Sequence, residues 1–319
     1  MSEPPIVSIN PPINEPVMRL KMRHFTSGAF QVLCSLSAWV GIVALTVMLI
    51  VIFQMSKGSL DWKFLTSFDS ASPNRTGILV GIWGTFWLMM MTSCIAIPVG
   101  VAAAVYLEEY ARKTWLTSLI QLNISNLAGV PSIVYGMLGL TIFVRYMQMG
   151  NNLLSASLTL SILILPIIII STQEALRSVP QSIRHASLAL GATKWQTIWS
   201  QVLPASVPGI MTGVILSVSR AIGESAPLIV LGAVTYIGQT PGKIETIPQL
   251  IQNPAAIAQV PTSSYTVLPL QIYNYAALQA KSAFRHEAAA AIIVLLVILL
   301  LMSSIAIFIR HRFQKNLKW

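Results

Sequence analysis

The chain has 319 residues, of which 55% are hydrophobic and only 9% are charged, and its mean hydropathy is +0.71. Soluble domains usually carry about 25% charged residues, so this composition excludes an ordinary soluble protein and indicates that most of the chain lies in lipid. The formal net charge is +10. In a membrane protein such a charge reflects topology and anionic headgroups, so it does not predict nucleic-acid binding.

Six long apolar segments predict helices that cross the membrane. A spanning helix needs about 20 mostly apolar residues, and each segment approaches or exceeds that length. Only the fifth contains charges, and an uncharged stretch from Thr114 precedes the third. In chain order the predicted spans cover residues 28–53, 77–107, 127–144, 153–171, 205–233 and 288–309. The sequence therefore predicts an all-α integral membrane protein with one six-span domain over residues 28–310.

The distribution of Lys and Arg predicts the orientation of these spans. With both termini in the cytoplasm, the cytoplasmic segments hold twelve basic residues and the opposite side holds seven, as the positive-inside rule requires. Residues 1–27 then form a cytoplasmic tail, which five Pro residues before residue 18 predict to be disordered. Residues 311–319 form a basic cytoplasmic tail, and residues 235–287 form a long outer loop.

Residues suited to catalysis or metal binding are scarce. The two cysteines, Cys34 and Cys94, lie within predicted spans, so we expect them to be buried packing residues rather than a disulfide or a metal site. No His or carboxylate pair has ligand spacing, and no nucleotide-binding or hydrolase motif occurs. The sequence therefore predicts no catalytic residue, metal or bound cofactor in this chain.

A polar segment over residues 174–204 separates the fourth and fifth spans. Pro180 after a Ser suits a helix start. Ile183, Ala186 and Leu190 then form an apolar stripe that we expect to lie opposite Arg184 and Ser187.

Gly191 suits the end of that helix, and Thr193 to Gln196 fits a capping box that begins a second one. Three interpretations are open: an interfacial connector, a docking element for a cytoplasmic partner, and a DNA-reading helix-turn-helix, which is physically remote between two close spans.

The docking interpretation is favoured by a resemblance. His185-Ala186-Ser187, Gly191 and Leu203-Pro204 resemble the Glu-Ala-Ala, Gly and Ile-x-Leu-Pro loop of ABC importer permeases. In that family the loop carries a short coupling helix that docks on a separate ATPase, which uses ATP and Mg²⁺. The resemblance therefore assigns Pro180, Arg184, His185, Ala186, Ser187, Gly191, Leu203 and Pro204 to ATPase coupling. Two positions differ, because His185 replaces the acidic residue and Gln201 replaces the Ile.

Further motifs are similar to the PstA-type phosphate permeases, over about residues 28–310. The matching segments are 174–180, 189–195, 209–213, 220–227 and 268–275. The resemblance implies a bacterial inner-membrane permease for inorganic phosphate that lacks catalytic activity of its own. Its implied partners are a second homologous permease, an ABC ATPase dimer, an extracytoplasmic phosphate-binding protein and membrane lipid, without nucleic acid.

Arg220 and Glu224 are unusual because they lie deep within the fifth predicted span. A central charge costs roughly 2.5–3.5 kcal/mol on insertion scales, so such residues normally face a protein interior or an aqueous path. One interpretation is an ion pair at i and i+4 that only neutralises itself. The other is a substrate path, in which Arg220 binds phosphate oxygen and Glu224 accepts the proton that hydrogen phosphate carries and sulfate lacks.

Two further features lie on the outer side of this pair. Pro227 removes a backbone hydrogen bond and crowds the carbonyl of Gly223, so it is a candidate hinge beside Glu224. The outer loop, 235–287, exceeds the length of a simple connector. The resemblance implies that it receives the binding protein, while a membrane-surface lid anchored by tyrosines is the alternative.

Two rival functions stay open beside phosphate import. The same architecture serves for another oxyanion, such as sulfate or molybdate. A secondary carrier would instead use Arg220 and Glu224 for ion coupling and would need no ATPase. The polar segment 174–204 argues against the carrier, because a carrier has no use for a docking element.

Overall fold

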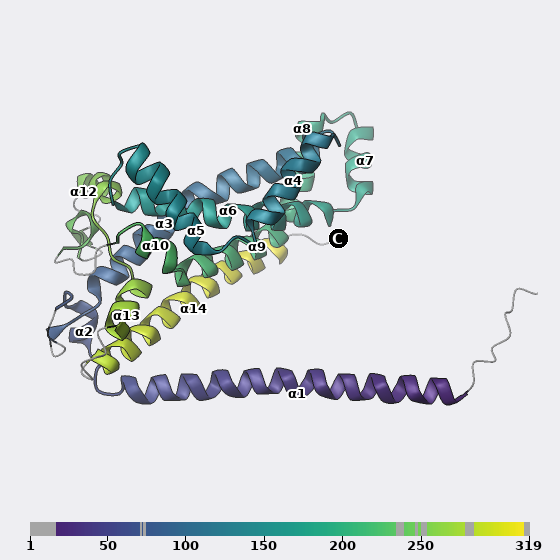
Figure 1. The fold of residues 1–319 in the computed structure, drawn as a ribbon. Coiled ribbons are helices and arrows are strands. Elements are labelled where there is room, and N and C mark those ends of the chain that lie inside the picture. Colours follow the sequence, from purple (N-terminus) through teal and green to yellow (C-terminus); the bar gives the residue numbers. More distant parts are fainter. Residues whose placement is uncertain are drawn as a thin grey trace, which may run out of the picture. The chain divides into compact units, whose positions relative to one another are not determined.

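The structure is a computed structural model that describes residues 17–70, 72, 75–233, 239–245, 248–249, 254–277 and 284–315. Within this part of the chain every regular element is a helix. Contacts divide the chain into two compact units, one ending at Ile52 and one beginning at Phe53. Figure 1 labels the helices in chain order.

The first unit consists of most of one long helix, α1 (Val17–Ser56), which crosses the unit boundary near its end. The prediction placed a span at 28–53, so the helix begins eleven residues earlier, and part of the expected tail is helical. Helical hydrogen bonding continues through the basic residues before Gly28 because nothing there breaks a helix. Residues 1–16 of the predicted tail lie outside the described residues.

The second unit is built on four long helices that match predicted spans. They are α3 (Leu79–Val105), α6 (Leu153–Arg177), α9 (Leu203–Gly223) and α14 (Arg285–Lys315). Helix α6 packs against α3 and α9, and α9 packs in turn against α14. Figure 1 shows these helices lying side by side. Because α14 runs to Lys315, much of the expected basic tail is helical, while residues 316–319 lie outside the described residues.

The third predicted span is bent. Residues 127–144 were expected to form one helix, but α4 (Trp115–Leu127) is followed by a break and then by α5 (Ser132–Gly139), which continues as the π-helical η3 (Leu140–Tyr146). The helix direction bends by 106° at the break between the two halves. The break contains Gly129 and Pro131, and proline lacks the N–H that a continuous helix requires. The described residues therefore hold five helices able to cross a membrane, or six if the bent pair is one span.

The fifth predicted span is also interrupted. A single helix was expected over 205–233, but α9 ends at Gly223 and a short helix, α10 (Ala226–Val230), follows after two non-helical residues. Pro227 lies in the first turn of α10, where its missing N–H costs no hydrogen bond. The interruption therefore falls where the sequence predicted a loosened helix.

Glycines let the neighbours of α6 approach closely. A Cβ atom on Gly100 of α3 would meet the Ile168 side chain at 2.6 Å, and a Cβ on Gly209 of α9 would meet Ala175 at 2.7 Å. Gly213 of α9 similarly faces Ser171. Between lipid-embedded helices, small residues provide most of the attraction by letting backbones pack closely. Helix α6 is therefore the close-packed centre of the second unit.

Hydroxyl groups in the buried first half of α6 bond back to the helix itself. Ser157 and Thr159 donate to the carbonyls of Leu153 and Ser155 at 3.0 and 2.8 Å, and Ser161 donates to Ser157 at 2.6 Å. Ser161 also reaches the carbonyl of Thr92 in α3 at 3.3 Å. These bonds satisfy polar atoms that would otherwise be costly in an apolar interior.

Short elements cover one end of the second unit. They are α2 (Trp62–Thr66), η5 (Pro241–Lys243), α12 (Pro254–Gln259), η6 (Val260–Thr262) and α13 (Leu268–Ala277). Helix α13 carries Tyr273 and Tyr275, two tyrosines of the predicted outer loop, and much of that loop lies outside the described residues. Tyr275 is fully buried and stacks on Phe284. It packs in the core rather than at a membrane surface.

The Asp69 carboxylate joins two distant parts of this end. It accepts hydrogen bonds from Thr76 and from Tyr275, both at 2.9 Å. Burial raises the pKa of Asp69, and the two hydroxyl donors oppose that rise. We call Asp69, Thr76 and Tyr275 the outer clasp, because Tyr275 belongs to the predicted outer loop.

Both cysteines are exposed in the structure, so the prediction that they are buried packing residues is wrong. In a membrane helix an apolar side chain is stable against lipid as well as in the protein interior, so low polarity does not indicate burial there. Spacing within an apolar span therefore could not reveal which of its faces packs inward.

Gly136 gives a test of the packing between the two interrupted spans. A Cβ atom there would lie 2.6 Å from the Cα of Pro227, and backbone cannot swing away as a side chain can. We expect Gly136→Ala to lower the free energy of unfolding in detergent by about 1–3 kcal/mol. Gly41→Ala is the control, because nothing lies within 4 Å of Gly41. Equal stability of the two variants would contradict this packing.

The outer clasp predicts a pH dependence. Because the pKa of Asp69 is raised on folding, the native state binds more protons than the unfolded state between the two pKa values. Stability from this group is therefore lost as pH rises through the folded pKa. Asp69→Asn can still accept both hydroxyl donors, so we expect its stability relative to wild type to increase from pH 4 to pH 7. Unfolding in detergent across that range is the measurement, and a constant difference would contradict the prediction.

Candidate functional site

The segment predicted to dock on a partner, residues 174–204, forms a helix-turn-helix between α6 and α9. Helix α6 ends at Arg177, and Pro180 in an extended conformation precedes α7 (Gln181–Ala189). Gly191 follows with φ of +83°, a left-handed conformation that glycine adopts without strain. The sequence predicted both this short helix and its glycine end. We call residues 174–204 the coupling loop.

The second helix of the coupling loop begins with the predicted capping box. The Thr193 hydroxyl accepts from the backbone N–H of Gln196, and the Gln196 amide oxygen accepts from that of Thr193. Helix α8 (Lys194–Thr197) follows, continues as the π-helical η4 (Ile198–Val202), and leads into α9. Leu203 and Pro204 form the first turn of α9, where proline is readily accommodated.

The faces of α7 differ from the prediction. The apolar stripe of Ile183, Ala186 and Leu190 was expected opposite Arg184 and Ser187, with the stripe buried. Only Ile183 packs inward, against a small buried cluster. Ala186 is exposed and Leu190 is 89% exposed.

Arg184 and Ser187 instead share the inner side with Ile183. Arg184 is largely buried, and the Ser187 hydroxyl is 2.9 Å from that of Thr197 in α8. Arg184 faces inward because backbone carbonyls and a carboxylate on that side accept its hydrogen bonds. The outer side of α7 presents His185, Ala186, Leu188 and Leu190, and all four are exposed.

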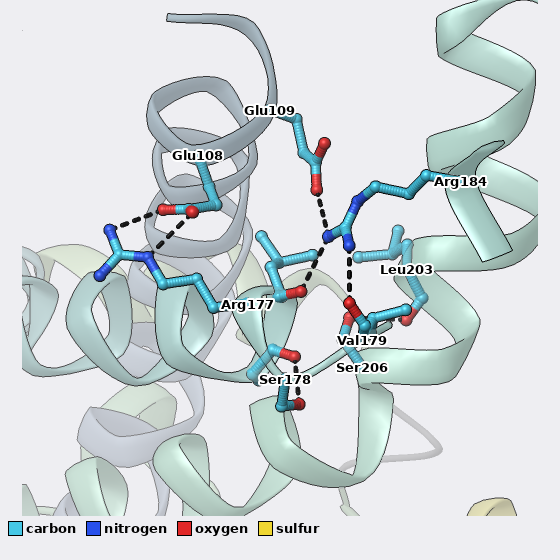
Figure 2. Close-up of polar contacts among 10 residues, drawn as sticks. Glu108, Glu109, Arg177, Ser178, Val179, Arg184, Leu203 and Ser206 are labelled. Carbon is cyan, nitrogen blue, oxygen red and sulfur yellow. Dashed lines mark hydrogen bonds and ion pairs between the residues drawn. The ribbon is translucent and has the colours of Figure 1, made fainter. Parts of the chain in front are cut away.

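The guanidinium of Arg184 binds three acceptors. One nitrogen donates to the Glu109 carboxylate at 2.8 Å and to the Leu176 carbonyl at 2.9 Å, and another donates to the Val179 carbonyl at 2.7 Å. Figure 2 shows the guanidinium between the carboxylate and the chain that leads into α7. The side chains of Arg184 and Glu109 are only 12% and 10% exposed. Buried charges of this kind require full pairing.

Glu109 belongs to a π-helical turn, η2 (Tyr106–Tyr110), which extends the end of α3. The neighbouring Glu108 pairs with Arg177 at 2.8 Å (Figure 2), and Lys194 lies 5.1 Å above the Tyr110 ring. Sequence reasoning did not identify Glu108 or Glu109. Two adjacent acids at the end of an apolar span, on the side assigned to Arg177 and Arg184, are the signal that could have found them.

Arg220 and Glu224 lie at the far end of α9 from the coupling loop. Their side chains pair at 3.4 Å, and Arg220 is 45% exposed. The two were expected on one face of a continuous helix, but Glu224 is extended and caps α9. The structure thus contains the ion pair of the simpler interpretation and leaves Arg220 accessible.

The predicted site residues form two separate groups. From Leu203 to Arg220, helix α9 covers about 25 Å at 1.5 Å per residue. The coupling loop and the Arg220–Glu224 pair therefore do not touch. Helix α9 joins them directly, and Pro227 follows just beyond the pair in α10.

The structure combines long apolar helices, two interrupted spans, and a helix-turn-helix inserted before one of these spans. These features define a multi-pass membrane protein. The chain belongs to the family described as "Binding-protein-dependent transport system inner membrane component", whose family model matches residues 96–318. Residues 96–318 include the whole coupling loop, the Glu109–Arg184 pair and the Arg220–Glu224 pair.

Among individual proteins, the probable ABC transporter permease YqgH of Bacillus subtilis is 38% identical over 189 residues, covering 56% of this chain and 61% of that protein. The phosphate transport system permease PstA of Yersinia pestis is 35% identical over 183 residues, covering 56% and 62%. The matches thus span about 60% of the length of these relatives.

A solved structure shares the fold. A bacterial ABC transporter involved in the import of the acidic polysaccharide alginate aligns with a TM-score of 0.57 at 14% identity, covering 93% of this chain and 99% of that chain. An inward-facing structure of the MetNI methionine ABC transporter aligns with a TM-score of 0.53 at 16% identity, covering 73% and 94%. At such low identity these likenesses establish the fold of type I ABC importer permeases and nothing about substrate.

Gly191 tests the geometry of the coupling loop. Proline fixes φ near −65°, whereas Gly191 has φ of +83°, so Gly191→Pro should disrupt the turn between α7 and α8. We expect faster trypsin cleavage after Arg184 and Lys194 in the detergent-solubilised chain. Gly191→Asn is the control, because asparagine tolerates the left-handed conformation. Unchanged cleavage of the proline variant would contradict the assigned turn.

Proposed function

We propose that this chain is the membrane-spanning, non-catalytic permease subunit of an ATP-driven importer that moves inorganic phosphate into the cytoplasm. The observation that carries the proposal is the coupling loop, a short helix held at one end of the bundle with its outer face exposed. Membership of a binding-protein-dependent transport family supports an importer, and the likeness to PstA proteins supports phosphate.

The proposed partners are those that the resemblance to ABC importer permeases implies. A second homologous permease completes the membrane path, and a dimer of ABC ATPases docks on the coupling loops and uses ATP and Mg²⁺. An extracytoplasmic phosphate-binding protein delivers substrate to the opposite side. The chain lies in the bacterial inner membrane, with both termini in the cytoplasm, as the distribution of its basic residues predicts.

The outer face of α7 suits the docking role. Leu188 and Leu190 are 46% and 89% exposed, beside the exposed His185 and Ala186. His185 occupies the place of the acidic residue in related loops, so it offers a ring nitrogen for hydrogen bonding rather than a carboxylate to the ATPase. We propose that ATP-driven closure of the ATPase moves α7, and that the spans which frame it, α6 and α9, move with it.

Arg220 and Glu224 are the proposed substrate contacts within the path. The described hydrogen bond of Arg220 uses only Nε, so its terminal nitrogens are placed to donate to an incoming oxyanion. Glu224 then accepts a hydrogen bond from the protonated oxygen of hydrogen phosphate, a donor that sulfate lacks. The helix break between Gly223 and Ala226, with Pro227 beyond it, is the proposed hinge.

The experiment that tests this function is uptake of radiolabelled phosphate by proteoliposomes that contain the chain with its co-purifying partners. We expect uptake that requires ATP and resists excess sulfate and molybdate. Competition by either anion would indicate that a transporter of the same family carries another oxyanion as its substrate. Uptake driven by an ion gradient without an ATPase would replace the proposal with a secondary carrier.

Arg220→Ala tests the substrate path. We expect phosphate uptake to be abolished while the complex still assembles, because the Arg220 side chain is 45% exposed. Uptake per assembled complex is the measurement, with assembly checked by co-purification of the ATPase. Arg220→Lys is the matched control, since it keeps the charge and loses the planar fork. Wild-type uptake in assembled Arg220→Ala complexes would reject the role.

A further inference from the structure

We propose that Glu109 and Arg184 are positioning residues that fix the coupling helix α7 to the end of α3, so that α3 moves with α7 as one body. The inference rests on the proposed function and adds a second route for motion to it. Along the chain, α7 is continuous only with α6 and with α8 and α9. The Glu109–Arg184 pair joins it sideways to a span that is remote in sequence.

The contacts of Arg184 make this junction rigid. Its three acceptors belong to η2, to the last turn of α6 and to the link before α7. A guanidinium presents planar donors in a fixed geometry, so three simultaneous bonds leave it little freedom. Both side chains are about nine-tenths buried, where water cannot substitute for a lost partner.

The other contacts of η2 point the same way. Glu108 pairs with Arg177 at the end of α6, and Tyr110 lies under Lys194 at the start of α8. Three successive parts of the coupling loop thus reach one turn of α3. The Arg177 side chain is 55% exposed, however, and exposed pairs contribute little. The junction therefore depends chiefly on Glu109 and Arg184.

The local geometry of η2 allows this pattern. Its π-helical turn closes with the N–H of Ala111 donating to the Tyr106 carbonyl at 2.8 Å. The adjacent Glu108 and Glu109 then reach two different arginines, one in α6 and one in α7. π-helical turns occur often at functional sites. Disturbing Glu109 should therefore release α7 from α3 while leaving the Arg177 contact in place.

The test compares Glu109→Gln with Glu108→Gln in the assembled complex. Glutamine keeps the shape and an acceptor oxygen but removes the charge. For Glu109→Gln we expect the ATPase to remain bound and active while the ATP hydrolysed per phosphate imported rises about fivefold or more, the lower range of a typical coupling free energy. Arg184→Lys should behave similarly, because a single ammonium nitrogen lacks the planar fork from which two nitrogens reach the three acceptors. Glu108→Gln is the matched control and should stay near wild type.

A second measurement does not depend on transport. Spin labels at Lys113, three residues beyond η2, and at Ser182 in α7, both exposed, report the separation of these two segments in a chain whose Cys34 and Cys94 are replaced by Ser. In the wild type we expect one distance with and without ATP bound to the complex. In Glu109→Gln we expect that distance to broaden or change with nucleotide. A purely structural role would lower the thermal stability without altering this nucleotide response.

The outcomes separate the two proposals. Wild-type complexes that import no phosphate would reject the proposed function, and the spin-label distance would then decide the role of Glu109 by itself. A wild-type distance that changes with nucleotide, or a Glu109→Gln complex with an unchanged ATP-to-phosphate ratio, would overturn the junction alone. If Glu109→Gln fails to fold, Arg184→Lys provides the same comparison.

Discussion

Close packing around α6 is the constraint on which the second unit depends. Glycines of α3 and α9 bring their backbones against α6, and a Cβ atom at Gly100 or Gly209 would collide with it. In lipid there is little hydrophobic gain from joining two apolar helices, so this fit and a few hydrogen bonds must supply the attraction. Because α6 is fixed on two sides, the chain that leaves its end starts from a defined position.

That defined start explains the form of the coupling loop. Helix α6 ends at Arg177, α7 begins four residues later, and the capping box directs the chain back toward α9. The short connections restrict the orientation of α7, and the Arg184 contacts restrict it further. The exposed outer face of α7 is therefore presented in one orientation, as a surface that meets a partner should be.

Local sequence patterns predicted much of this structure. Long apolar runs located the long helices, Pro227 marked the interruption of the fifth span, and Gly191 and the Thr193 capping box marked the coupling loop. Each of these signals acts through the backbone within a few residues. The substrate and coupling roles of individual residues stay predictions, because neither a partner nor a substrate contact follows from the chain alone.

The features that the sequence did not predict depend on tertiary contacts. The inward face of α7 could not be read from its own residues, since Arg184 is drawn inward by Glu109, 75 positions away. Periodicity ranks Arg184 as a surface residue because it contains no information about a distant carboxylate. The exposed Cys34 and Cys94 were missed for a related reason, because lipid and protein interior favour the same side chains.

The outer clasp has a consequence for biosynthesis. Tyr275 bonds with Asp69 and Thr76 across sequence separations of 206 and 199 residues. Tyr275 leaves the ribosome long after α3 and α6 have entered the membrane, so the outer end cannot close while the early spans are being inserted. Until then, Asp69 and Thr76 lack the hydrogen bonds of Tyr275. Closure of this end is therefore a late event, which requires the segment that carries Tyr275 to have reached its place.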